Sequence, residues 1–197
     1  MTVSTTFEAP AELGSTLSEG ARKELDLLGI DDRGRLRERP MQGIDPVAGR
    51  TPVPRRDIRA PEVLNEAYDY ASAFSRGLRV DLGGATLLLL SGTASIDDQG
   101  RTLYPGDFRA QCLRTYRNLT ALLAAENASW HDVVRTTCYL RDIERDYDTF
   151  NEIRTMFLRA VGMDPLPAST GIQARLCRSD LLVEIEAMAV VPLERAR

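Results

Sequence analysis

Two carboxylates stand inside the long apolar segment at residues 181–191, which we expect to form the last strand. Successive side chains of a strand point to opposite faces, so Glu184 and Glu186 share one face while the alternate positions form an apolar face. Burying an unpaired carboxylate is costly. Glu184 therefore either faces solvent, as most acids in strands do, or lies in a pocket where its charge or proton is used. Glu186 is expected to be structural.

Cys177 is a second candidate for chemistry, because the neighbouring Arg178 could stabilise the thiolate that reactive cysteines need. The alternative, which the sequence favours, is a small buried hydrophobic side chain. The three cysteines have no C-x-x-C spacing, and His131 is the only histidine. We therefore expect no disulfide framework and no metal site.

The composition limits the classes of partner. The 197 residues suit one domain of ordinary size, and 29 acids against 25 bases, with no basic run, argue against a dedicated nucleic-acid-binding protein. The first residues have no signal-peptide pattern, and no apolar run approaches the roughly 20 residues that span a bilayer. We expect a soluble, cytoplasmic protein that binds neither nucleic acid nor membrane.

Residues 1–60 differ from the rest of the chain. They contain five prolines and a polar run at residues 31–35, with a short helical pattern only at residues 21–28. We expect a partly irregular N-terminal extension over residues 1–60 and a folded domain over residues 61–197. Pro61 could open a short helix that ends near residue 71.

The pattern becomes regular from residue 74 onwards. Gly83-Gly84 is a hairpin signal, the four leucines at 87–90 are expected to lie in a buried strand, and two apolar stripes at helical spacing predict long helices. The expected elements are strands at 77–81 and 85–91, a helix at 107–126, a strand at 133–140, a helix at 147–161, and strands at 169–174 and 181–191. This order predicts an α+β fold, a mixed sheet with both helices packed on one face.

Several segments, taken together and in order, resemble the Rid (YjgF) family over about residues 74–191. These segments are 80–83, Ser91-Gly92, 107–111, 118–119, 132–140, Phe150-Asn151, Pro167-Ala168 and 183–187. The resemblance implies a homotrimer whose sheets form a central barrel, with a small-molecule site in the cleft between neighbouring subunits. It also implies cofactor-free hydrolysis of reactive 2-imino or enamine acids to keto acids and ammonia.

The resemblance assigns roles to individual residues. Glu184 would orient or activate the attacking water, while Ser91-Gly92, Asn151 and Phe74 would complete the site. The arginine with which the family's deaminases bind the substrate carboxylate does not carry over, and the residues that shape this part of the pocket are Ser169 and Gly171. A serine hydroxyl cannot replace a guanidinium. Arg175, six residues further along the expected strand, is a candidate for a displaced cation.

A second resemblance is to the C-terminal half of chorismatases. It rests on residues 74–76, 91–96, 106–107 and 177–186, and it implies that Cys177 and Glu184 lie at one active centre. The chain is too short for the N-terminal half of that family and lacks its histidine-containing turn. This resemblance suggests a divergent protein of specialised metabolism.

Three functions remain open at this point. The first is hydrolysis of an imine, enamine or related intermediate, which needs only a positioned water and one tunable carboxylate. The second is a chorismatase-like reaction on a cyclic carboxylate. The third is a non-catalytic module that binds a metabolite or regulates a partner.

Overall fold

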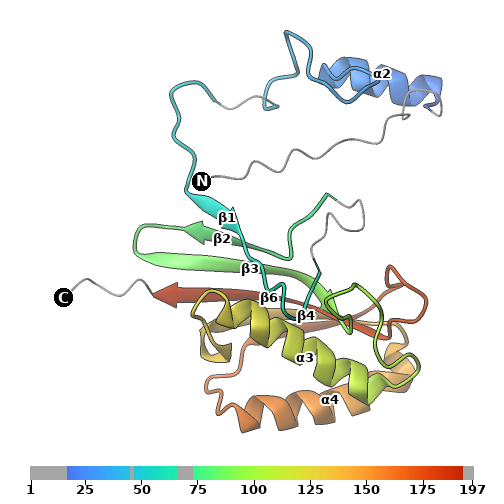
Figure 1. Cartoon of the computed structure of the whole chain (residues 1–197), viewed down its shortest axis with the longest axis vertical. Coiled ribbons are helices and arrows are strands. Elements are labelled where there is room, and N and C mark those ends of the chain that lie inside the picture. The colour runs from blue at the N-terminus through green and yellow to red at the C-terminus, as the bar shows by residue number, and fades with distance from the viewer. Residues whose placement is uncertain (1–16, 45–46, 66–72, 193–197) are drawn as a thin grey trace. The chain divides into compact units, whose positions relative to one another are not determined.

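One six-stranded sheet organises residues 53–197 in the computed structural model, which describes residues 17–44, 47–65 and 73–192. The strands are β1 (Arg55–Asp57), β2 (Gly77–Asp81), β3 (Ala85–Ala94), β4 (Val133–Leu140), β5 (Ala168–Gln173) and β6 (Val183–Pro192). Their order across the sheet is β1-β2-β3-β6-β4-β5 (Figure 1). All neighbours are antiparallel except β4 and β5, so the expected mixed sheet is confirmed.

Both long helices cover the same face of the sheet, as expected (Figure 1). In α3 (Phe108–Ala124) the whole predicted apolar stripe is buried, and Asp107 caps the helix by accepting a hydrogen bond from the Ala110 N–H at 3.0 Å. Helix α4 (Ile143–Ala160) begins one turn before the predicted start at residue 147, because Asp142 provides an N-cap. The short 3₁₀ helix η2 (Trp130–Asp132) opens with a capping box from Ser129.

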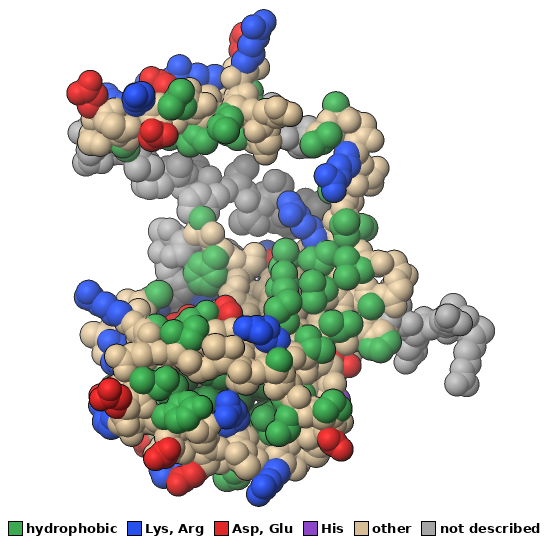
Figure 2. Space-filling view, turned by 180° about the vertical axis from the view of Figure 1, so that it is seen from behind, with side chains coloured by type: hydrophobic (Ala, Val, Ile, Leu, Met, Phe, Trp, Pro, Cys, Tyr) green, Lys and Arg blue, Asp and Glu red, His purple; other side chains and the backbone are tan. Residues whose placement is uncertain are grey.

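The face of the sheet opposite the helices is open within one chain. Leu88 and Leu90 are buried under the helices, whereas Leu87 and Leu89 point to the open face and are only half-buried. The expectation of a fully buried leucine strand is therefore wrong for one face, because helices cover the other face alone. Figure 2 looks onto the open face and shows hydrophobic side chains gathered over the sheet.

The sheet begins earlier in the chain than the expected domain boundary. The chain divides into two compact units at residues 1–52 and 53–197, because β1 pairs with β2 and so belongs to the second unit.

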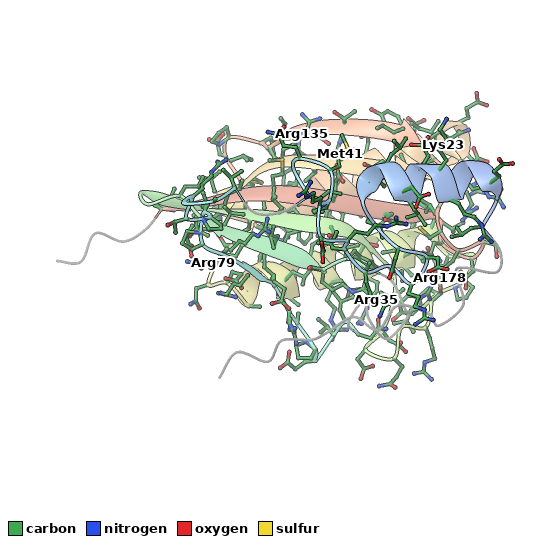
Figure 3. The ribbon with its side chains drawn as sticks, turned by 90° about the horizontal axis from the view of Figure 1, so that it is seen from above. Lys23, Arg35, Met41, Arg79, Arg135 and Arg178 are labelled. Atoms are coloured by element: carbon green, nitrogen blue, oxygen red, sulfur yellow. The ribbon has the colours of Figure 1, made fainter. Side chains whose placement is uncertain are left out.

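An ion-pair network also holds the β1–β2 edge of the sheet. The Glu126 side chain, only 2% exposed, accepts hydrogen bonds from Arg56 at 2.7 and 2.6 Å and from Arg79 at 3.1 Å (Figure 3 labels Arg79).

The sequence predicts two short helices before the regular part of the chain, one at residues 21–28 and one that starts at Pro61. The predicted helix at residues 21–28 is confirmed as α2 (Glu19–Leu28), which Ser18 caps and which ends at Gly29 with φ +74°. Residues 61–63 form a turn in place of the start of the helix expected from Pro61, and residues 66–72 lie outside the described residues.

Candidate functional site

Glu184 lies on the open face of the sheet, as strand alternation predicts. Its neighbours Val183 and Ile185 are fully buried under the helices, while Glu184 itself is half-buried and pairs across the strands with Tyr139 on β4. Its carboxylate lies against Gly92. A Cβ on residue 92 would stand 2.0 Å from Glu184 Oε1, so only glycine leaves room for this side-chain position.

The surroundings of Glu184 favour its protonated form. Burial raises the pKa of Glu184 above its ordinary value, the nearby charge of Glu186 adds to the effect, and the charge of Arg76 opposes both. Burial, with the charge and hydrogen bonding of Glu186, also raises the pKa of Tyr139 on the same face. A carboxyl group whose pKa is raised by burial is suited to exchanging protons with a bound reactant.

A bulge in β3 at Ser91 and Gly92 shapes the space beside Glu184. The Ser91 hydroxyl donates to the Ser75 carbonyl at 2.7 Å, and the Ser91 N–H donates to the Arg76 carbonyl at 3.1 Å. The Arg76 guanidinium lies over the exposed Phe74 ring, 5.3 Å from its centroid. Four predicted site residues, together with Arg76, thus form one group, the glutamate cluster: Phe74, Arg76, Ser91, Gly92 and Glu184.

A pocket of about 480 Å³ opens on the other, helix-covered face of the sheet, between β4, β5 and α4. Ser169 and Gly171 line it from β5, and Arg154 lines it from α4. The Arg154 guanidinium donates to Ser169 Oγ at 3.2 Å, and Ser169 Oγ is 3.0 Å from Thr136 Oγ1. We call this cavity the arginine pocket.

Asn151, predicted to bind substrate, supports the arginine pocket. Its Oδ1 accepts a hydrogen bond from Arg154 Nη2 at 2.6 Å. Arg154 is not among the site residues predicted from the sequence, although the sequence contains a signal for it. Residues three apart on a helix share a face, so a polar Asn151 facing a site brings residue 154 to the same place.

The strand register separates the glutamate cluster from the arginine pocket. Ser169 pairs with Thr136, and Gly171 pairs with Cys138, which in turn pairs with the buried Ile185. These residues point toward the helices, whereas Glu184 and Tyr139 point to the open face. Seven of the nine predicted site residues therefore form two groups on opposite faces of one sheet, and a single chain does not bring the two groups together.

Comparison with known proteins identifies the family. The family model described as Endoribonuclease L-PSP, which represents the YjgF/RutC/Rid proteins, matches residues 65–191. The chain belongs to the Rid family. This confirms the predicted family and fold.

The regions matched between this Rid protein and its relatives cover most of the length of each relative. A RutC family protein of Pyrococcus abyssi is 28% identical over 116 residues, which cover 59% of this chain and 84% of that protein. The 2-iminobutanoate/2-iminopropanoate deaminase of Mus musculus is 30% identical over 117 residues, 59% of this chain and 80% of that protein. The crystal structure of Escherichia coli TdcF with bound serine is 25% identical, has a TM-score of 0.57, and covers 68% of this chain and 98% of TdcF.

Two predicted residues of this Rid protein lie outside both groups. β5 ends at Gln173, so Arg175 does not continue the strand face of Ser169, and its side chain is exposed. Cys177 is exposed as well, which contradicts the expectation of a small buried residue. Among the described residues, no hydrogen bond joins Cys177 to Glu184. The loop from β5 to β6 carries both side chains outward, because only Leu176 and Leu181 of this stretch are buried.

Two other kinds of feature, a metal site and a membrane-spanning helix, are absent from the residues that the structure describes. Among residues 17–44, 47–65 and 73–192, no three His, Cys, Asp or Glu side chains gather in a way that could hold a metal ion. No helix in the same ranges has both the length and the apolar character needed to cross a membrane.

Proposed function

We propose that this protein is a cofactor-free hydrolase of a reactive imine, enamine or related small molecule, with Glu184 as the acid–base group. The observation that carries the proposal is the position of Glu184 against Gly92, half-buried and with a raised pKa. A deaminase among the relatives of known activity supports this reaction type.

The chemistry needs one water and one proton carrier. The Glu184 carboxylate takes a proton from water as the oxygen attacks the carbon of the protonated imine, which gives a neutral carbinolamine. The proton on Glu184 then passes to the carbinolamine nitrogen, and ammonia leaves while the carboxylate takes the hydroxyl proton and the carbonyl forms. The protonated imine and water thus become a ketone and an ammonium ion, once Glu184 has released this last proton. A carboxyl group with a raised pKa accepts and returns this proton more readily than an ordinary one.

We include in this proposal a homotrimer with sites between subunits. The glutamate cluster and the arginine pocket lie on opposite faces of one sheet, so a complete site requires the glutamate cluster of one subunit to meet the arginine pocket of the next. The half-buried leucines of the open face supply apolar surface that such an assembly would cover. The related TdcF structure holds serine, which supports a small-molecule site.

The reaction is tested with the variant Glu184→Gln. The substrates are 2-imino acids generated in situ by an amino-acid oxidase, with semicarbazide competing for the imine, and chorismate is assayed separately. The matched control is Glu152→Gln, whose side chain is 65% exposed. We expect Glu184→Gln alone to lower turnover of an imine by about a hundredfold or more, within the usual range for a proton-transfer residue. Turnover unchanged from the wild type would refute the acid–base role of Glu184.

Assembly is tested on the same samples by analytical ultracentrifugation. The expected mass is three times the 21.9 kDa of the chain. A monomer that hydrolyses imines would contradict the intersubunit site while leaving the reaction in place.

A non-catalytic metabolite-binding module is the second candidate. The observation in its favour is that the arginine pocket is formed entirely within one chain, independently of Glu184. Saturable binding of carboxylic acids without turnover of any substrate in the panel would favour this function.

A further inference from the structure

We propose that Arg154 makes the arginine pocket a binding site for a carboxylate with an apolar body. Arg154 would hold the acid group, and the inner wall of the pocket would hold the apolar part. Only one part of the inference rests on the proposed function, namely that the bound acid is the substrate or the product. The binding site itself stands on the geometry of one chain.

The Arg154 guanidinium is held in place by contacts with three residues. Asn151 Oδ1 accepts from Nη2 at 2.6 Å, and Ser169 Oγ accepts from Nη1 at 3.2 Å. The Phe150 ring lies 5.4 Å from the guanidinium carbon, within the range of a cation–π contact. Contacts from both α4 and β5 thus fix the group before any ligand arrives, which reduces the entropy lost on binding.

The charge of Arg154 is not balanced by an acid. Within the described part of the chain, both of its hydrogen-bond partners are neutral, and no carboxylate forms an ion pair with it. Two other arginines, one on α3 and one on α4, differ in this respect. Arg109 pairs with Glu152 at 2.9 Å, and Arg145 pairs with Asp146 at 2.6 Å. A guanidinium has five N–H donors, of which these bonds use two, so Arg154 keeps donors for a planar anion.

The rest of the pocket fits a carboxylic acid better than an inorganic anion. Ser169 and Thr136 contribute hydroxyls on the β-sheet side of the pocket, and its lining also includes the buried apolar side chains of Ile185, Leu158 and Trp130. A phosphate or sulfate would leave this apolar surface uncovered. A cavity of about 480 Å³ also has room for more than a formate or an acetate.

Arg159 is the rival cation, since it also lines the pocket from α4. Its side chain is exposed, and it makes no hydrogen bond to a described residue, so its position is not fixed as that of Arg154 is. This makes Arg159 the natural control, because its loss changes the charge of the same helix and the same pocket by the same amount.

The experiment uses the full chain and the fluorescence of Trp130, the only tryptophan in the sequence, which lines the pocket. Hexanoate is the probe, and hexanamide and acetate are matched ligands that lack the charge and the apolar body. Titrations are run on the wild type and on Arg154→Met and Arg159→Met, with thermal unfolding to verify the fold. Arg154→Lys is added in case the methionine variant does not fold.

We expect hexanoate to bind the wild type about tenfold or more tightly than hexanamide, the discrimination expected of a charge-assisted hydrogen bond. Arg154→Met should remove this preference, Arg154→Lys should reduce it, and Arg159→Met should keep it. Equal binding of hexanoate and hexanamide to the wild type would overturn the proposal, as would loss of the preference in Arg159→Met alone. Because binding is measured without turnover, an inactive but selective protein would refute the proposed reaction and leave this inference intact.

Discussion

The carboxylate of Glu184 occupies the space where a side chain on Gly92 would begin. A Cβ there would stand 2.0 Å from Oε1 and 3.0 Å from the carboxyl carbon of Glu184. Atoms that are not bonded to one another cannot approach so closely, so any side chain at residue 92 must displace the carboxylate. Gly92 lies in the β3 bulge, which brings backbone without a side chain next to the catalytic candidate.

Gly92→Ala is therefore expected to separate activity from stability. The displaced group is the end of a flexible side chain, so we expect a change in unfolding free energy within about 1 kcal/mol. Moving the carboxylate by about 1 Å should lower the turnover rate by about a hundredfold. Gly84→Ala is the matched control, since a Cβ there meets no atom within 4 Å. Full activity in Gly92→Ala would show that the observed position of Glu184 is not the catalytic one.

The raised pKa of Glu184 predicts how stability depends on pH. In the range between the ordinary pKa of a glutamate and the raised value, the folded protein binds more protons than the unfolded chain. Stability therefore falls as the pH rises through this range. Glu184→Gln removes that loss, so we expect the variant to be more stable than the wild type at neutral pH.

Urea denaturation at about pH 4 and about pH 7.5 measures this effect, because the two values lie on either side of the range in which a perturbed glutamate titrates. The advantage of Glu184→Gln should shrink at the lower pH. Glu152→Gln, on the exposed surface, should show no such pH dependence. A variant that is less stable than the wild type at neutral pH would mean that the charged form of Glu184 is stabilised by the fold.

Most of the fold could be predicted from local signals. Helical spacing identified α3 and most of α4, and Gly83-Gly84 identified the β2–β3 hairpin, since these depend on neighbouring residues. Strand β1 could not be found this way. Its three residues, Arg-Arg-Asp, have no strand pattern, and they join the sheet through pairing with β2 and through Glu126, which is distant in the sequence.

The candidate site was predictable only where it depended on one strand. Alternation placed Glu184 and Glu186 on one face, which the structure confirms. Arg154 approaches Ser169 from another element, so its role depends on how α4 packs against β5. The prediction for Arg175 requires the strand to continue past Gln173, where β5 ends, and nothing in the local sequence marks that end.

Glu126→Ala tests whether the ion-pair network holds β1 to the domain. The Glu126 side chain is 2% exposed, and its removal leaves Arg56 and Arg79 without their shared acceptor. Arg79 is itself only 22% exposed, so we expect a loss of about 1–3 kcal/mol in unfolding free energy. Glu152→Ala removes an exposed ion pair with Arg109 and should cost less than about 1 kcal/mol. Similar losses in the two variants, measured by urea denaturation, would show that the network stabilises the sheet edge no more than an exposed ion pair does.

Phe74→Ala and Phe150→Ala should affect different quantities, the first mainly the activity and the second mainly the stability of the protein. Phe150 is completely buried, so its truncation is expected to cost about 3–5 kcal/mol of stability. Phe74 is 46% exposed and contacts Arg76, so its truncation should change stability by less than about 1 kcal/mol and act mainly on kcat/KM. Thermal unfolding and imine hydrolysis measure the two quantities. A Phe74→Ala protein with wild-type kinetics would remove Phe74 from the glutamate cluster.

Ser169→Arg tests whether the cation of the arginine pocket can be moved from α4 to β5. In the single variant, the new guanidinium would lie beside Arg154, which now donates to Ser169 Oγ at 3.2 Å. Like charges at this distance repel each other, so we expect a loss of about 0.5–1 kcal/mol in stability. The double variant Ser169→Arg with Arg154→Ala removes the repulsion and keeps one cation. We expect the double variant to recover both the lost stability and the preference for hexanoate over hexanamide. If the losses of stability in the two single variants simply add up in the double variant, the two positions do not share one site.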